Sequence, residues 1–134
     1  MIMPYAKTKS QKMDGEKMNR FLMIGLMLFS QVVFADAVKI VDVKIKQQAG
    51  QQIRIDVTLL HADTGWDHYA DGWQVLDENK KVIATRVLYH PHVSEQPFTR
   101  SLSGVVINKQ MRFIYIRAHD KVHGNSELKK IDLN

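Results

Sequence analysis

Histidine and aspartate are concentrated in three short segments of this 134-residue chain. All six histidines lie in or beside 61–71 (HADTGWDHYAD), 90–98 (HPHVSEQPF) and 120–126 (DKVHGNS). Neutral imidazole is the commonest protein ligand for transition metals, and carboxylates complete or orient the ligand set. Coordination of a divalent metal ion is therefore the chemistry that these segments could perform together.

The candidate metal ligands are the six histidines and three neighbouring aspartates, namely His61, His68, His90, His92, His119, His123, Asp63, Asp67 and Asp120. His90-Pro91-His92 is the strongest local signal, because proline restrains the backbone between the two histidines. We expect Zn²⁺ or Cu²⁺, with Ni²⁺ as a further candidate. Copper(I) is not expected, since the segment after residue 35 has no cysteine and a single methionine, Met111. None of the spacings matches a regular zinc signature, so only the folded chain can identify the ligands.

A structural role suits the same residues. Histidine and aspartate side chains can brace long loops by hydrogen bonding to the backbone, and Asp63-Thr64-Gly65 is typical of an Asx turn. The two interpretations are compatible, because a braced loop can present a site.

Aromatic residues in the same segments suggest a second function. Trp66, Tyr69 and Phe98, with Glu95 beside them, could anchor a protein or glycan of the cell envelope. A third hypothesis is a small metal-dependent hydrolase in which Glu95 or Asp67 acts as the general base. The domain is small for an enzyme and its sequence indicates no substrate cleft, so a binding module is preferred.

Alternating apolar and polar residues predict the elements that position these segments. The predicted strands cover 38–46, 52–60, 72–76, 82–89, 99–107, 111–119 and 127–133. Seven short antiparallel strands in about 100 residues predict an all-β, immunoglobulin- or fibronectin-III-like sandwich, with Trp73 between the sheets. Successive connections alternate between the two ends of such a sandwich. All six histidines then fall at one end, and plain polar turns occupy the other.

The first 35 residues have the order of a secretory signal peptide. Lys17 and Arg20 precede the apolar run 21–29, and small residues follow. The run is 15 residues long even when extended to Ala35, which is short of the roughly 20 that a membrane-spanning helix needs. We therefore predict an over-long start or extended charged region at 1–17, a signal peptide at 18–35 and one domain at 36–134. Cleavage is expected after Ala35, with Ala37 as the alternative.

This processing sets the expected location and charge of the mature protein. We expect a periplasmic or secreted protein without membrane attachment, and no lipoprotein processing, because no cysteine follows either cleavage site. Five basic and two acidic residues leave with the leader, so 14 basic and 12 acidic residues remain. A net charge this small gives no indication of nucleic-acid binding. The chain has no cysteine, so its stability must come from its core and not from disulfides.

Several segments carry a resemblance to known proteins. They are 61–71 with Trp73, then Leu88 to Val93 (LYHPHV), Gln96 to Leu102 (QPFTRSL), His119-Asp120 and Val122 to Gly124 (VHG). In these segments the chain resembles a group of small exported bacterial proteins, largely uncharacterised, that have a signal peptide and one sandwich domain. The resemblance covers most of the predicted mature chain and implies the fold and export, with no established activity to transfer.

Overall fold

A computed structural model describes residues 37–134, so the predicted signal peptide and the segment before it lie outside the described residues. The described part contains eight strands and no helix, and thus no helix long and apolar enough to cross a membrane. The strands are β1 (Lys39–Gln47), β2 (Gln52–Leu60), β3 (Ala70–Leu76), β4 (Val82–Val87), β5 (Phe98–Val106), β6 (Phe113–Asp120), β7 (Gly124–Asn125) and β8 (Lys129–Asp132).

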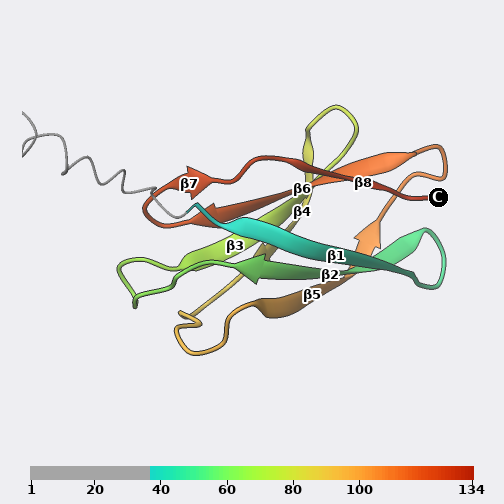
Figure 1. The fold of residues 1–134 in the computed structure, drawn as a ribbon. Helices are drawn as coiled ribbons and strands as arrows, with labels where there is room; N and C mark the ends of the chain where they lie inside the picture. Colours follow the sequence, from blue (N-terminus) through green and yellow to red (C-terminus); the bar gives the residue numbers. More distant parts are fainter. Residues whose placement is uncertain (1–36) are drawn as a thin grey trace, which may run out of the picture. The chain divides into compact units, whose positions relative to one another are not determined.

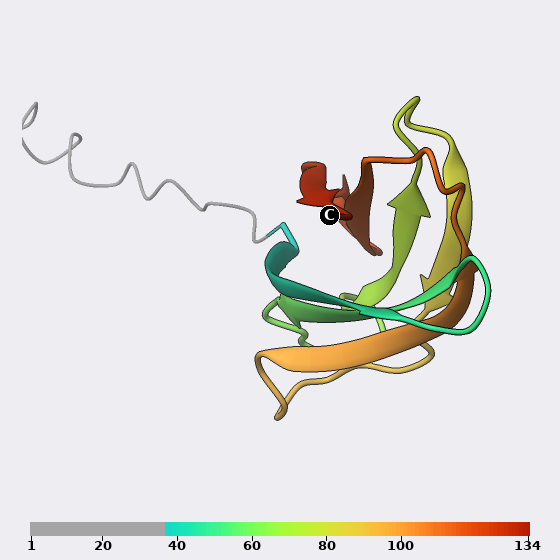
Figure 2. The ribbon, with the colours of Figure 1, turned by 90° about the vertical axis from the view of Figure 1, so that its right-hand side faces the viewer.

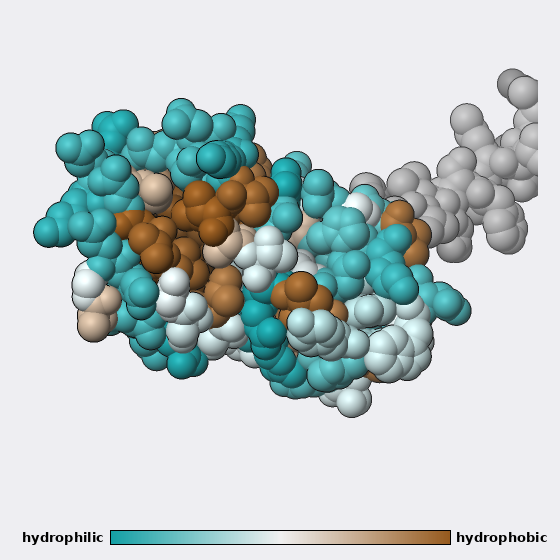
Figure 3. Space-filling model, turned by 180° about the vertical axis from the view of Figure 1, so that it is seen from behind, coloured by the Kyte–Doolittle hydropathy of each residue, from teal (hydrophilic) through white to brown (hydrophobic). Residues whose placement is uncertain are grey.

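The strands form two antiparallel sheets that face each other (Figures 1 and 2). One has the order β1-β2-β5, and the other has the order β4-β3-β6-β7, with β8 also paired to β6. The prediction of an all-β domain is confirmed for residues 37–134, and its two antiparallel sheets agree with a sandwich. β4 and β5 are edge strands and carry the exposed valines Val82, Val87 and Val106. Apolar side chains gather over part of the rear face, while much of that face is polar (Figure 3).

Period-two alternation explains the core. In β2, Ile53, Ile55, Val57 and Leu59 are at most 1% exposed, as their spacing predicts for one face of a strand. Trp73 on β3 is 1% exposed and belongs to the same hydrophobic core. Its predicted place in the core is thus confirmed.

The predicted strand at 127–133 is where the sequence interpretation differs most from the structure. Only 129–132 of the predicted range form a strand, β8, and a second short strand, β7, lies before it in the segment predicted as a loop; both pair with β6. Between them, the Ser126 hydroxyl accepts a hydrogen bond from the Ala118 backbone N–H at 2.9 Å. A side chain thus fills a position in the ladder that a backbone carbonyl would occupy in a continuous strand.

The three histidine-bearing connections meet at one end of the sandwich, at the left of Figure 1. They link β2 to β3, β4 to β5 and β6 to β7. We call this end the histidine pole, defined as residues 61–69, 88–97 and 119–123. The prediction that alternate connections bring these segments together is confirmed.

Candidate metal centre

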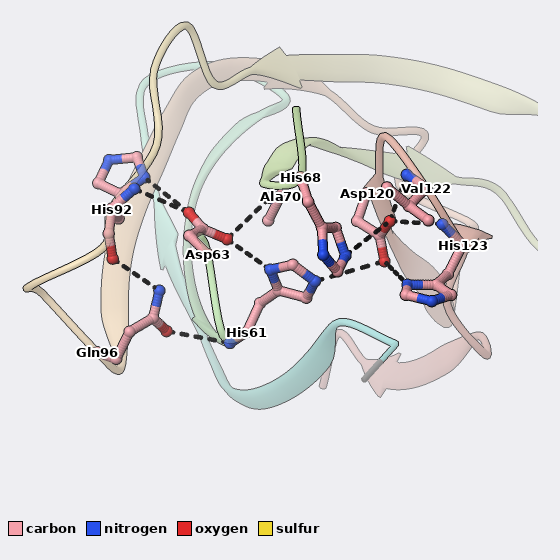
Figure 4. Close-up of polar contacts among 9 residues, drawn as sticks. All are labelled: His61, Asp63, His68, Ala70, His92, Gln96, Asp120, Val122 and His123. Carbon is pink, nitrogen blue, oxygen red and sulfur yellow. Dashed lines mark hydrogen bonds and ion pairs between the residues drawn. The ribbon is translucent and has the colours of Figure 1, made fainter. Parts of the chain in front are cut away.

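Four side chains of the histidine pole converge on one point (Figure 4). His61, His68, Asp120 and His123 each offer one ligand atom, and these atoms all lie within 4.8 Å of one another. Asp120 is central: its Oδ2 lies 3.5 Å from His61 Nε2 and 3.2 Å from His123 Nδ1, and its Oδ1 lies 3.7 Å from His68 Nε2. Ligands at zinc distances in a tetrahedral site are separated by about 3.4 Å. A small inward movement would therefore suffice to coordinate an ion.

Two tight turns bring the more exposed ligands to this point. His68 closes a turn in which its N–H donates to the Gly65 carbonyl at 3.2 Å, while its own carbonyl accepts from Thr64 N at 3.0 Å. Gly65 has φ of 151°, a backbone conformation that side chains rarely adopt. The second turn follows β6, where Asp120 Oδ1 accepts the backbone N–H groups of Val122 at 2.7 Å and His123 at 2.6 Å.

Burial divides the four ligands into an inner and an outer pair. The side chains of His61 and Asp120 are fully buried, whereas those of His68 and His123 are 23% and 27% exposed. His61 Nε2 and His68 Nε2 are both buried without a hydrogen-bond partner. An unsatisfied buried polar atom costs about 1–3 kcal/mol. A metal ion would satisfy both nitrogens at once.

Asp63 fixes the orientation of His61. Its Oδ1 contacts His61 Nδ1 at 2.5 Å and accepts the Ala70 N–H at 3.0 Å, while its Oδ2 accepts the His92 backbone N–H at 2.8 Å. An ionised carboxylate only accepts hydrogen bonds, so the contact places a proton on His61 Nδ1. In the neutral ring, the lone pair of Nε2 then faces Asp120 Oδ2. Two electron-rich atoms opposed in this way are stabilised by a cation between them.

Charge balance favours the same conclusion. Burial acts to raise the pKa of Asp120, but hydrogen bonds from the backbone of His123 and Val122, aided by the charges of nearby imidazoles, hold that pKa below its usual value. Within 37–134, the ion pairs of Asp63 and Asp120 are all with histidine and none is with lysine or arginine. A divalent cation would balance the two buried carboxylates.

The other predicted ligands lie outside this cluster. His92 is 5% exposed and stacks on Phe98 with a ring distance of 4.1 Å, and its burial, followed by the charges of Arg100 and His90, lowers its pKa. His90 is exposed, with its ring 4.7 Å from that of His92. His119 Nδ1 contacts Asp71 Oδ1 at 2.5 Å, away from the cluster. The His-Pro-His segment, the strongest local signal, is therefore not part of the four-residue group.

The predicted aspartate ligands divide in the same way. Asp120 belongs to the cluster and Asp67 lies on the surface. Asp63 contacts His61 Nδ1, the ring nitrogen that points away from the cluster. Each Asp63 oxygen already accepts at least one N–H, so neither is directed at the four ligand atoms.

The predicted partner-binding residues differ in exposure. Trp66 is 64% exposed, but Tyr69 is 9% and Phe98 only 2% exposed. Glu95 is held by Arg100 through contacts of 3.1 and 3.3 Å, and the hydrogen bonds from Arg100 lower its pKa. Of the three rings, only Trp66 is available to a large partner in this structure.

Sequence reasoning missed Gln96. Its Oε1 accepts the His61 backbone N–H at 3.0 Å, and its Nε2 donates to the His92 carbonyl at 3.0 Å. This side chain joins the connection between β4 and β5 to the end of β2. No local pattern distinguishes it from an ordinary surface glutamine, because its partners lie 35 and four residues away.

Comparison with known proteins finds a relative that is similar in sequence over most of the chain. The chain is 38% identical over 85 residues to a protein of Halomicrobium mukohataei named "Putative lipoprotein". The match covers 63% of this chain and 41% of that protein, so the chain spans well under half of the relative's length. No family model and no solved structure matches the chain.

Proposed function

We propose that this protein is an exported β-sandwich module that binds one divalent transition metal ion through His61, His68, His123 and Asp120. The observation that carries the proposal is the pair of buried, unpartnered imidazole nitrogens facing a buried carboxylate. Three imidazoles and one carboxylate, without sulfur, suit Zn²⁺ or Cu²⁺. The strand order and the buried Trp73 support an immunoglobulin- or fibronectin-III-like form of the sandwich.

The location is part of the proposal. The relative is named a lipoprotein, which supports a place in the cell envelope for this chain as well. The predicted signal peptide agrees with export to the periplasm or beyond. Detection of a processed chain beginning after Ala35 or Ala37, by mass spectrometry of the protein expressed in bacteria, tests this part.

The metal proposal is tested by titrating the purified protein with Zn²⁺ and Cu²⁺, using calorimetry for stoichiometry and NMR for the histidine ring signals. We expect one ion per chain, with shifts of the His61, His68 and His123 rings. The affinity should fall on acidification, because a protonated imidazole cannot coordinate. His68→Ala removes a partly exposed ligand and should weaken binding roughly 100-fold.

His119→Ala is the matched control for that variant. His119 also contacts a carboxylate, at 2.5 Å, but lies outside the four-residue cluster. The control should bind the ion with wild-type affinity. If wild-type protein binds neither metal at micromolar concentration, the metal proposal is wrong.

A second candidate function rests on exposed apolar surface at the same pole. Trp66, Tyr89 and Val122 are 64%, 73% and 57% exposed, which favours contact with a protein or glycan of the envelope. The hydrolase alternative gains no support from the contacts of its two candidate bases, since Glu95 is paired with Arg100 and Asp67 lies on the surface.

A further inference from the structure

The ten residues 88–97, between β4 and β5, have no regular secondary structure. Leu88 anchors their beginning in the core, and Phe98 follows their end. Between these points the loop is held by His92, whose ring stacks on Phe98 and whose backbone N–H donates to Asp63 Oδ2 at 2.8 Å. Gln96 supplies the other connection, from the His92 carbonyl to the His61 N–H.

Part of the loop borders an open hollow and not a packed core. Val93 and Gln96 line a surface pocket of about 470 Å³ together with His61, Asp63 and residues of β1 and β2. Val93 is 59% exposed. Segments with few buried apolar contacts open locally at low free-energy cost, so the polar contacts of this loop decide how ordered it is.

Those polar contacts converge on the residues that hold His61. Asp63 uses Oδ1 for the His61 ring and Oδ2 for the loop, so a single carboxylate connects the candidate metal ligand to His92 (Figure 4). We propose that occupation of the metal site orders the loop 88–97 through Asp63. This inference rests on the proposed metal-binding function.

The physical basis is the polarisation of the imidazole. An ion on Nε2 withdraws electron density from the ring and strengthens the hydrogen bond that Nδ1–H donates to a carboxylate. It also balances the negative charges of Asp63 and Asp120 on either side of the His61 ring. Both effects hold Asp63 in the orientation that accepts the His92 N–H. Because coupling is reciprocal, a change that opens the loop weakens metal binding, by at most the factor by which the ion stabilises the ordered loop.

The test is hydrogen exchange of the backbone amides of 92–96, measured by NMR on the purified protein with and without saturating Zn²⁺. Binding is measured on the same samples by calorimetry. Couplings between sites are typically 5- to 150-fold, and we expect zinc to slow exchange of the His92 amide about tenfold. Ser94→Ala, which changes an exposed side chain of the same loop, should show the same slowing.

Two variants separate coupling from binding. Asp63→Asn can still accept from His61 and Ala70 through its oxygen, but its NH₂ group then faces the His92 N–H. It should therefore bind zinc more weakly than the wild-type protein and, at saturating zinc, show no slowing of exchange in the loop. Gln96→Ala leaves both Asp63 oxygens untouched and removes the second connection, so it should speed exchange in the loop and weaken zinc binding about tenfold.

The outcomes distinguish this inference from the proposed function. If one zinc ion binds and exchange at 92–96 is unchanged, the coupling is wrong and the metal site stands. A Gln96→Ala variant with a looser loop and wild-type affinity also overturns the coupling. Absence of zinc binding by the wild-type protein overturns both.

Discussion

Asp56 and Asp120 are carboxylates of the same domain with different surroundings. Asp56, on β2, has a side chain that is 13% exposed, and its Oδ1 accepts from Arg54 Nε at 2.9 Å and from the Ser101 hydroxyl at 2.6 Å. Lys46 Nζ lies 3.6 Å from its Oδ2. Asp120 is fully buried, and within 37–134 its polar contacts are with backbone N–H groups and imidazoles.

Both carboxylates have a pKa below the usual value, but for different reasons. Hydrogen bonds from Ser101 and Arg54 lower the pKa of Asp56, and each has a larger effect than the burial that acts to raise it. The pKa of Asp120 is lowered although burial acts to raise it. Asp56 therefore has its charge balanced by Arg54 and Lys46, whereas Asp120 faces imidazole rings, and the Nε2 atoms of His61 and His68 have no hydrogen-bond partner. The comparison teaches that a low carboxylate pKa does not itself indicate a site, and that the unpartnered imidazole nitrogens beside Asp120 are what support the proposed metal centre.

The largest expected effect is on thermal stability: the gain in stability on metal binding should depend on Asp120 and not on Asp56. At a free zinc concentration 100 times the dissociation constant, binding adds about 2.7 kcal/mol to the free energy of unfolding. For a domain of this size that corresponds to a rise in Tm of roughly 10–20 °C, which chelation with EDTA should reverse. Differential scanning calorimetry measures the change. Asp56→Asn should retain the whole increment and Asp120→Asn should lose it; an equal increment in both variants would contradict the comparison.

How far the sequence predicts the different surroundings of Asp56 and Asp120 depends on the level of structure. Alternation in β2 identifies the buried face of Ile53, Ile55 and Val57 because one strand's periodicity is a local property. The gathering of the histidine segments follows from strand alternation and was also predictable. The choice among six histidines was not, since it depends on where each ring points after the turns at Gly65 and Asp120 are formed.

Asp63 shows more clearly why the sequence could not identify the ligands. Its residue type and position make it a reasonable ligand, and the sequence predicts it as one. In the folded chain its oxygens accept N–H groups of Ala70 and His92, which lie seven and 29 residues away. Only tertiary structure can reveal that these donors use the carboxylate and turn it away from the cluster.

Without metal, the same two substitutions should have opposite effects on stability. In Asp120→Asn the amide oxygen can keep the backbone hydrogen bonds from Val122 and His123. The two N–H groups of the amide can donate to the unpartnered His61 Nε2 and to His123 Nδ1, whose ring then carries its proton on Nε2. Gaining the hydrogen bond to His61 should raise the free energy of unfolding by about 1 kcal/mol. Asp56→Asn loses charge-assisted hydrogen bonds and should lower it by about 1 kcal/mol. Urea denaturation in EDTA measures both, and destabilisation by Asp120→Asn would show that Asp120 is already satisfied without an ion.

The smallest expected effect is a difference in pH dependence between the sheet and the histidine pole. Since the pKa of Asp56 is lowered on folding, its contribution to the free energy of unfolding is present above the unfolded value of about 3.8 and is lost as the pH falls through the folded value.

The pKa of His92 is lowered by burial, so the unfolded chain takes up a proton first and stability declines as the pH falls below about 6.5. His92→Phe preserves stacking on Phe98 and should reduce the decline between pH 6.5 and 5, leaving the acid limb unchanged. Asp56→Asn should do the reverse. Urea denaturation of the metal-free protein from neutral pH to below pH 3.8 measures both slopes. An unchanged slope in His92→Phe would place the titrating group elsewhere in the pole.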